Sequence, residues 1–173
     1  MNNDRVKDVA IVIQTKDSIL EKRCNSCYAS YKKGRILLIL LSKGIDTTVV
    51  FQHNTFIARP DEGAMVPNLE PDLSIEQNKL TIDYQYVRGH TSYIFKLTQN
   101  DLELIAAKSS GVSGENISNI DFNFETMTLI DTEGKIGEDS SKVDTIHLPF
   151  SKMKRLSEMK VMYDWEVIKN IFL

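Results

Sequence analysis

The stretch that most constrains the fold is residues 80–97, LTIDYQYVRGHTSYIFKL. Its first half places apolar or aromatic residues at every second position, which is typical of a strand with one buried face. These residues are Leu80, Ile82, Tyr84 and Tyr86. After the turn sequence RGHT, the second half alternates in the same way through Tyr93, Phe95 and Leu97. Two such runs joined by a short Gly-containing turn predict a β-hairpin, which we expect at the centre of an antiparallel sheet.

Other short runs rich in β-branched and aromatic residues predict strands along most of the chain. They are residues 9–14, 35–42, 47–52, 73–76, 102–107 and 143–148. A change in the parity of apolar positions between Phe124 and Met127 is interpreted as a bulge in one long strand. Residues 15–34 predict an exposed excursion, and the sequence SSGVSGENIS at 109–118 predicts a flexible loop.

The spacing of these strands predicts a mainly β fold, an antiparallel meander that forms a sandwich or a half-open barrel. We expect a single β-rich domain over residues 1–173. A C-terminal appendage begins at about residue 149, and in it Met153, Leu156, Met159 and Tyr163 recur at roughly helical spacing. That spacing predicts a short C-terminal helical segment, whereas the closing WEVIKNIFL fits a helix or a strand equally well.

Charge and hydropathy exclude some classes of partner. The formal net charge of −3 argues against broad electrostatic attraction to nucleic acid. The longest apolar run, ILLILL at 36–41, is far shorter than the roughly 20 residues that span a bilayer, so we expect no membrane span. We therefore expect an unknown ligand or protein partner, while the sequence leaves the oligomeric state open.

Several phrases carry a family resemblance across residues 4–130. They are KDVAIVIQ, GRILLILL, NTFIARPDEG, LSIEQNKLTIDYQYVRGHTSYIFKL, NDLELIAA and DFNFETMTL. In this order they resemble an uncharacterised family of secreted or periplasmic bacterial proteins, many of them lipoproteins. The resemblance implies export with a leader removed before Met1, whereas a native start at Met1 would mean a cytoplasmic protein. The chain departs from the family pattern at PDEGAM, residues 60–65, where members carry Gly-Gly.

Members of that family begin with a calcium-type loop, D-x-N-x-D-G-x-x-D, whose alternate oxygen ligands surround one Ca²⁺. Here Asn2, Asp4 and Asp8 fall at the third, fifth and ninth positions of that pattern. The first Asp is absent, and Arg5 occupies the position of the glycine. The alternatives are a degenerate Ca²⁺ loop held by these three residues and an ordinary solvated terminus.

Cys24 and Cys27 form a CxxC motif without a second pair of metal ligands. Its alternatives are a local disulfide or two inert thiols, partial metal binding, and redox catalysis. The three histidines, His53, His90 and His147, are scattered and accompany no catalytic motif, so we interpret them as surface hydrogen-bonding groups.

Two further groups of residues form a functional site only if the fold brings their side chains together. One group is Asp61, Glu62 and Glu70. It is interpreted either as the source of a carboxylate pair for glycoside hydrolysis or as an ordinary solvated acidic loop. The other group consists of four aromatic residues, which form a sugar-stacking platform if they are exposed. The alternation of apolar and polar positions instead favours an inward, core position for the tyrosines. The four residues are Tyr84, Tyr86, Tyr93 and Trp165.

The sequence therefore predicts an exported envelope protein that acts as a non-catalytic binding or accessory module. We expect its ligand or partner to contact residues 57–71 and 109–118. The alternatives are a polysaccharide hydrolase that uses loop carboxylates and an immunity or inhibitor-type protein. No catalytic residue and no bound cofactor other than Ca²⁺ is predicted.

Overall fold

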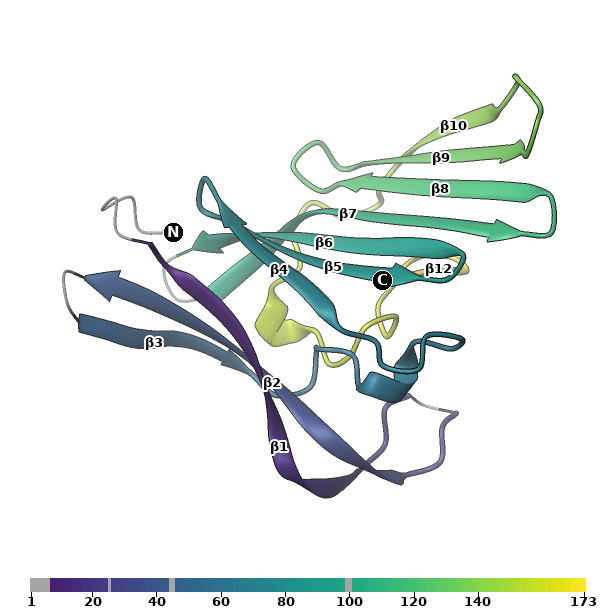
Figure 1. The fold of residues 1–173 in the computed structure, drawn as a ribbon. Coiled ribbons are helices and arrows are strands. Elements are labelled where there is room, and N and C mark those ends of the chain that lie inside the picture. The colour runs from purple at the N-terminus through teal and green to yellow at the C-terminus, as the bar shows by residue number, and fades with distance from the viewer. Residues whose placement is uncertain (1–6, 25, 44–45, 99–100) are drawn as a thin grey trace.

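A computed structural model describes residues 7–24, 26–43, 46–98 and 101–173 of the chain. In these residues the strands form three antiparallel sheets (Figure 1). The three-stranded sheet contains β1 (Val9–Glu21), β2 (Ser30–Lys43) and β3 (Asp46–His53). The seven-stranded sheet contains β4 (Pro71–Glu76), β5 (Lys79–Tyr86), β6 (Gly89–Thr98), β7 (Asp101–Ser113), β8 (Asn116–Asn123), β9 (Thr128–Lys135) and β10 (Lys142–His147). A small hairpin joins β11 (Glu166–Ile168) to β12 (Ile171–Phe172).

The prediction of a mainly β, antiparallel meander is confirmed, because β4 to β10 follow one another both along the chain and across the sheet. Residues 80–97 form the β5–β6 hairpin, in which Leu80 lies opposite Phe95 and Ile82 opposite Tyr93. The hairpin is second and third from the β4 edge, and β7 is the middle strand. Its expected place at the centre of the sheet is therefore wrong by one or two strands.

The core lies between the seven-stranded sheet, the three-stranded sheet and the C-terminal segment (Figure 1). Tyr84, Tyr93 and Phe95 are fully buried, which confirms the inward orientation expected from alternation. Phe56 packs edge-on against Tyr93 and Phe95, with ring centroids 5.2 and 5.8 Å apart. β1 and β4 are not hydrogen-bonded to each other, so the two large sheets form an open sandwich rather than a closed barrel.

The expected bulge between Phe124 and Met127 is instead a tight turn between two strands, β8 and β9. The side-chain oxygen of Asn123 accepts hydrogen bonds from the backbone N–H groups of Glu125 and Thr126, both at 3.0 Å. Met127 has a positive φ of 53°. A side chain that caps the following backbone in this way favours a turn over a continuous strand.

Two segments that were expected to be irregular are strands. β7 runs to Ser113 and β8 starts at Asn116, so the loop expected over 109–118 shrinks to a turn at Gly114. Gly114 has a φ of 62°, a conformation that glycine adopts without strain. Similarly, β1 extends to Glu21 and β2 starts at Ser30, so most of the expected excursion over 15–34 is an exposed β-ribbon.

The expected C-terminal helical segment is a single 3₁₀ turn, η2 (Leu156–Glu158). Leu156 and Met159 do face the core, but from a mostly extended chain. The backbone of this chain pairs with β7, because the Leu104 N–H donates to the Lys154 carbonyl at 2.9 Å. That pairing competes with a helix for the same backbone groups. Within the described residues, no helix is long and apolar enough to cross a bilayer.

Residues 54–70, the 54–70 loop, connect the two large sheets and contain the short 3₁₀ turn η1 (Pro60–Glu62). The fully buried Arg59 guanidinium fixes this loop with all five of its N–H donors. It binds both carboxylate oxygens of Glu21 on β1, at 2.6 and 2.9 Å. It also donates to three backbone carbonyls, those of Asn54, Ile57 and Arg35.

Two further arginines attach the same loop to the three-stranded sheet. Arg23 binds Glu62 through two hydrogen bonds of 2.7 and 2.9 Å and donates to the Thr55 carbonyl. Arg35 donates to the Ala58 and Leu69 carbonyls and to Glu70. Loop carbonyls that lack a strand partner are thus satisfied by guanidinium groups. We call Arg23, Arg35 and Arg59 the arginine triad.

We predict that Arg59→Met lowers the free energy of unfolding by about 3–5 kcal/mol, because it removes the guanidinium from the largely buried Glu21 carboxylate and from the Asn54 and Arg35 carbonyls. Arg155→Met is the matched control, since Arg155 is 46% exposed and lies 3.7 Å from Glu103. The control should cost less than about 1 kcal/mol. Urea unfolding measures both values. Equal losses in the two variants would contradict a central role for the triad.

We also predict that part of the stability is lost in acid through Glu62. Burial alone would raise the pKa of Glu62, but hydrogen bonds from Arg23 and from the Arg59 N–H outweigh it and lower the pKa below its usual 4.5. A carboxyl whose folded pKa is lowered stabilises the fold above its unfolded pKa, and this stability is lost as pH falls through the folded value.

The measurement compares urea unfolding of the wild type and Glu62→Gln at stepped pH. The wild type should be the more stable protein at about pH 6, and its advantage should shrink steadily below about pH 4.5. A stability difference that stays constant down to about pH 3 would show that Glu62 does not carry this dependence.

Candidate functional site

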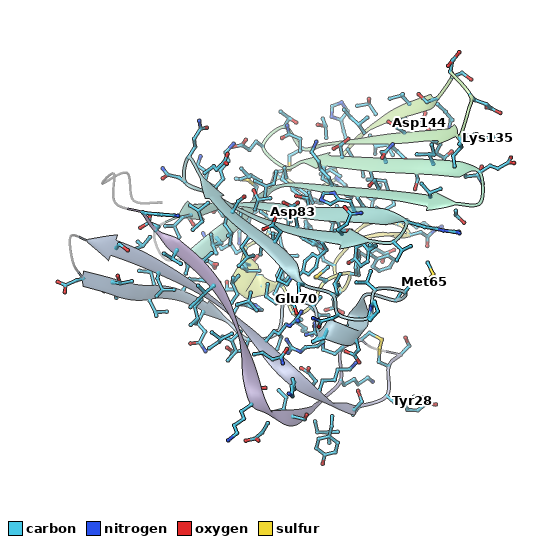
Figure 2. All side chains as sticks on the ribbon, viewed as in Figure 1. Tyr28, Met65, Glu70, Asp83, Lys135 and Asp144 are labelled. Atoms are coloured by element: carbon cyan, nitrogen blue, oxygen red, sulfur yellow. A yellow bond between two sulfur atoms is a disulfide. The ribbon has the colours of Figure 1, made fainter. Side chains whose placement is uncertain are left out.

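A pocket of about 330 Å³ opens where the β5–β6 turn, the 54–70 loop and the C-terminal segment meet. We call it the tyrosine pocket. The side chains that define it are Glu62, Met65, Tyr86, Arg88, Thr91 and Tyr163. Met65 projects from the 54–70 loop on the side of the molecule that Figure 2 shows. The volume lies at the lower end of the range for small-molecule sites.

Three hydroxyl groups form a connected chain in this pocket. The Tyr163 hydroxyl lies 2.8 Å from Thr91 Oγ1 and 3.2 Å from the Tyr86 hydroxyl. Two hydrogen bonds use two of the three hydroxyl protons, so one O–H remains to donate to another molecule. Burial and the hydrogen bond with Tyr163 raise the pKa of Tyr86 far above its usual value. The group therefore stays neutral and can act as a donor at physiological pH.

Behind this chain lie two more tyrosine hydroxyls in the core. Tyr84 accepts a hydrogen bond of 3.2 Å from the Ala58 N–H. The buried Tyr93 hydroxyl has no hydrogen-bond partner among the described residues. Burial, together with the nearby Tyr163, Tyr84 and Tyr86, raises the pKa of Tyr93. Tyr86 and Tyr93 therefore both stay uncharged at physiological pH.

Among the described residues that line the pocket, two carry a charge, Glu62 and Arg88. Glu62 forms part of the wall, but its carboxylate is held by Arg23 and by the Arg59 N–H. Arg88, in the β5–β6 turn, has no ion-pair partner within the described part of the chain. Met65 and Val87 are largely exposed and supply apolar surface. The pocket thus combines neutral hydroxyls, apolar rims and one available guanidinium.

Gly89 sets the shape of the hairpin that carries Tyr86 and Thr91. A Cβ at this position would lie 2.5 Å from the Ser110 carbonyl oxygen on β7. The same turn is tied to β7 by a 2.9 Å hydrogen bond from the Val112 N–H to the Arg88 carbonyl. Only glycine permits this approach of the two backbones without displacement.

The calcium-type residues fall largely outside the site. Asn2 and Asp4 lie outside the described residues. Asp8 is buried and accepts a 3.2 Å hydrogen bond from the Ser42 N–H, so it joins the start of β1 to β2. No group of three metal-binding side chains occurs in the described ranges. Calcium binding by Asn2, Asp4 and Asp8 stays a prediction.

Cys24 and Cys27 form a disulfide at the tip of the β1–β2 ribbon, which corresponds to the first alternative for the CxxC motif. The neighbouring Tyr28 is almost fully exposed and points away from the body of the protein (Figure 2). Arg23 directly precedes the disulfide, so the cross-link lies next to the arginine triad.

The three histidines lie on three different strands, β3, β6 and β10. His53 Nδ1 accepts hydrogen bonds from the Thr55 and Phe56 N–H groups, and burial lowers its pKa. His90 Nε2 lies 3.2 Å from Asp83, and His147 is exposed on the edge strand β10. None of these arrangements brings a histidine to the tyrosine pocket.

The loop carboxylates are ion-pair partners rather than an acid–base pair. Asp61 binds Lys32 at 2.5 Å, Glu62 binds Arg23 and Glu70 binds Arg35. The hydrogen bond from Lys32 lowers the pKa of Asp61, and the pKa of Glu62 is lowered as well. Glycoside hydrolysis requires one carboxyl with a raised pKa, so these residues do not support the hydrolase alternative.

Sequence reasoning missed Thr91 as a site residue, placed Tyr163 in a helical pattern and assigned Tyr86 to the core. Tyr163 meets Thr91 across 72 residues of sequence, which no local pattern signals. Trp165 was grouped with the tyrosines, but it stacks on Phe124 with ring centroids 5.5 Å apart and does not line the pocket. Comparisons with protein-family models, with curated proteins and with solved structures found no match for the chain.

We predict that Gly89→Ala destabilises the protein by about 1–3 kcal/mol, because the added methyl group collides with the Ser110 carbonyl. Gly111→Ala is the control, since its Cβ would have its nearest neighbours at 3.7 and 3.9 Å, which is ordinary contact. The control should change stability by no more than about 0.5 kcal/mol. Urea unfolding of both variants measures the difference, and equal effects would contradict the close approach.

Proposed function

We propose that the protein is an exported, non-catalytic envelope protein that binds a sugar residue in the tyrosine pocket. The observation that carries the proposal is the chain of hydroxyls formed by Tyr86, Tyr163 and Thr91 beside apolar surface. A sugar ring presents hydroxyls around its rim and an apolar C–H face. Hydroxyl groups that donate and accept, next to aromatic edges, complement both features.

Export is supported by the disulfide between Cys24 and Cys27. Disulfides persist in the periplasm and outside the cell, and are rare in the reducing cytosol. The family resemblance also favours export. An immunity or inhibitor-type protein of the cytoplasm stays an untested alternative, and the disulfide does not favour it.

Whether the pocket prefers a neutral or an acidic sugar depends on how Arg88 contacts it. A neutral sugar would use this guanidinium as a hydrogen-bond donor, whereas a uronic acid would pair with it through its carboxylate. Glucose and glucuronate differ in this one group, so they form a matched pair of probes. Tighter binding of glucuronate, lost in Arg88→Ala, would identify an acidic sugar as the ligand class.

The experiment titrates isotope-labelled protein with methyl glycosides of glucose, galactose, mannose, N-acetylglucosamine and glucuronate, followed by NMR. We predict saturating shifts at Thr91 and Tyr163 for at least one sugar in the millimolar range of Kd. Tyr163→Phe should weaken the binding of that sugar by about three- to tenfold, because the aromatic ring stays and one hydrogen bond is lost.

Tyr31→Phe is the matched control, since Tyr31 is 75% exposed on β2 and does not line the pocket. It should bind like the wild type. Shifts that cluster outside the pocket, or a Tyr163→Phe variant that binds every sugar as well as the wild type, would refute the proposed site.

A further inference from the structure

The outer half of the β1–β2 ribbon, residues 15–34, extends beyond the body of the protein (Figure 1). We call it the ribbon tip. Its inner face contacts the 54–70 loop, because Glu21 binds Arg59 and Lys32 binds Asp61. These two ion pairs hold the ribbon tip in place against the loop.

The outer face of the ribbon tip carries large apolar side chains. Leu20 on β1 lies opposite Tyr31 on β2, so both side chains point away from the face that holds Glu21 and Lys32. Leu20 is 60% exposed and Tyr31 is 75% exposed. Tyr28, at the end of the tip, is 95% exposed and points away from the body of the protein (Figure 2). Apolar side chains this exposed within one short ribbon indicate an interaction surface.

The unpaired charges of the ribbon tip are mostly positive. Lys16, Lys22 and Lys33 are exposed and have no ion-pair partner among the described residues. Lys33 is two residues from Tyr31 on β2, so it lies on the same outer face. Asp17 is the one carboxylate in the described part of the tip that lacks such a partner. The tip is therefore locally positive, although the whole chain carries a net charge of −3.

This combination of side chains fits the headgroup region of an anionic lipid bilayer. Tyrosine is favoured at a membrane–water interface because its ring is apolar and its hydroxyl is polar. Lysine lays its apolar stem along the acyl chains and places its ammonium group among the lipid phosphates. A projecting ribbon inserts such side chains between mobile headgroups, whereas a protein partner needs a surface of matching shape.

From these observations we propose that the ribbon tip docks on the surface of an anionic membrane. Leu20, Tyr28 and Tyr31 enter the interfacial layer, and Lys22 and Lys33 contact lipid phosphates. The disulfide and the two ion pairs fix the tip before contact, so little conformational entropy is lost on binding. The ribbon tip contributes no residue to the tyrosine pocket, so this proposal does not depend on sugar binding.

The test mixes the full chain with vesicles of equal parts phosphatidylglycerol and phosphatidylcholine, or of phosphatidylcholine alone. Sedimentation measures the bound fraction at about 50 mM and about 500 mM salt. We expect binding to the anionic vesicles at low salt, and at least about fivefold weaker binding at high salt, because salt screens the attraction between lysines and phosphates. Binding to phosphatidylcholine alone should be weaker by a similar factor.

The double variant Lys22→Gln, Lys33→Gln should bind the anionic vesicles at least about tenfold more weakly, since each lysine near the surface contributes about fivefold. The double variant Lys79→Gln, Lys96→Gln is the matched control. It removes the same charge from two exposed lysines that lie opposite each other on β5 and β6. The control should change binding by less than about twofold.

The apolar contribution has its own pair of variants. Leu20→Ser should weaken binding by about threefold or more, because it removes apolar area from the interfacial layer. Val143→Ser is the control, since Val143 is 57% exposed on the edge strand β10, and it should bind like the wild type. Lipid with a nitroxide on its headgroup should broaden the amide NMR signals of residues 18–22 and 28–33 and spare those of β10.

Thermal unfolding establishes that all four variants are folded. The proposal is overturned if the protein does not bind anionic vesicles at about 5 mM lipid, or if the two double variants bind equally. It is also overturned if signals broaden only outside residues 15–34. Binding to soluble polyglutamate that equals vesicle binding and does not respond to Leu20→Ser would assign the tip to an acidic protein partner instead. Self-association that Leu20→Ser abolishes, without vesicle binding, would assign it to a second copy of the chain.

Discussion

The contact on which the rest of the structure depends is the buried pairing of Arg59 with Glu21. A loop that joins two sheets has backbone carbonyls without a ladder, and burying them unpaired costs free energy. The planar guanidinium binds two of these loop carbonyls, the Arg35 carbonyl of β2 and the Glu21 carboxylate at once. Arg23 and Arg35 also donate to loop carbonyls and to a carboxylate. A lysine has three donors on one atom and cannot reach the same set. The loop therefore serves as a rigid wall for the tyrosine pocket.

The 54–70 loop also explains why the two large sheets form an open sandwich rather than a closed barrel. The 54–70 loop and the C-terminal segment complete the core in places where a barrel would use further strand pairs. The openings that remain are of two kinds. One is rimmed by the hydroxyls of Tyr86 and Tyr163, and the other by the unpaired edges of β1 and β4. Both lie beside residues that the triad holds in place.

Local sequence patterns predicted the features that interactions between sequence neighbours determine. The alternation in residues 80–97 was sufficient for the β5–β6 hairpin and for the burial of Tyr84 and Tyr93. Local patterns failed at Asn123, where a side chain competes with the backbone hydrogen bonds of a strand. They also failed at Leu156, where a mostly extended chain produces apolar spacing like that of a helix. The pocket was beyond prediction because Tyr163 reaches it only through tertiary packing. The loop carboxylates were visible in the sequence, but their pairing with Arg23, Lys32 and Arg35 was not.

The position of the C-terminal segment has a consequence for the order of folding. The hairpins of the meander connect neighbours in sequence, so their formation needs little loop closure and we expect it early. By contrast, the Thr55 hydroxyl donates to the Lys160 carbonyl across 105 residues, and Phe124 is covered by Trp165. The aromatic face of the large sheet therefore stays exposed to water until the segment that carries Phe150 and Trp165 has been synthesised. A partly synthesised chain that lacks residues 150–173 would therefore keep this aromatic face exposed and loosely packed.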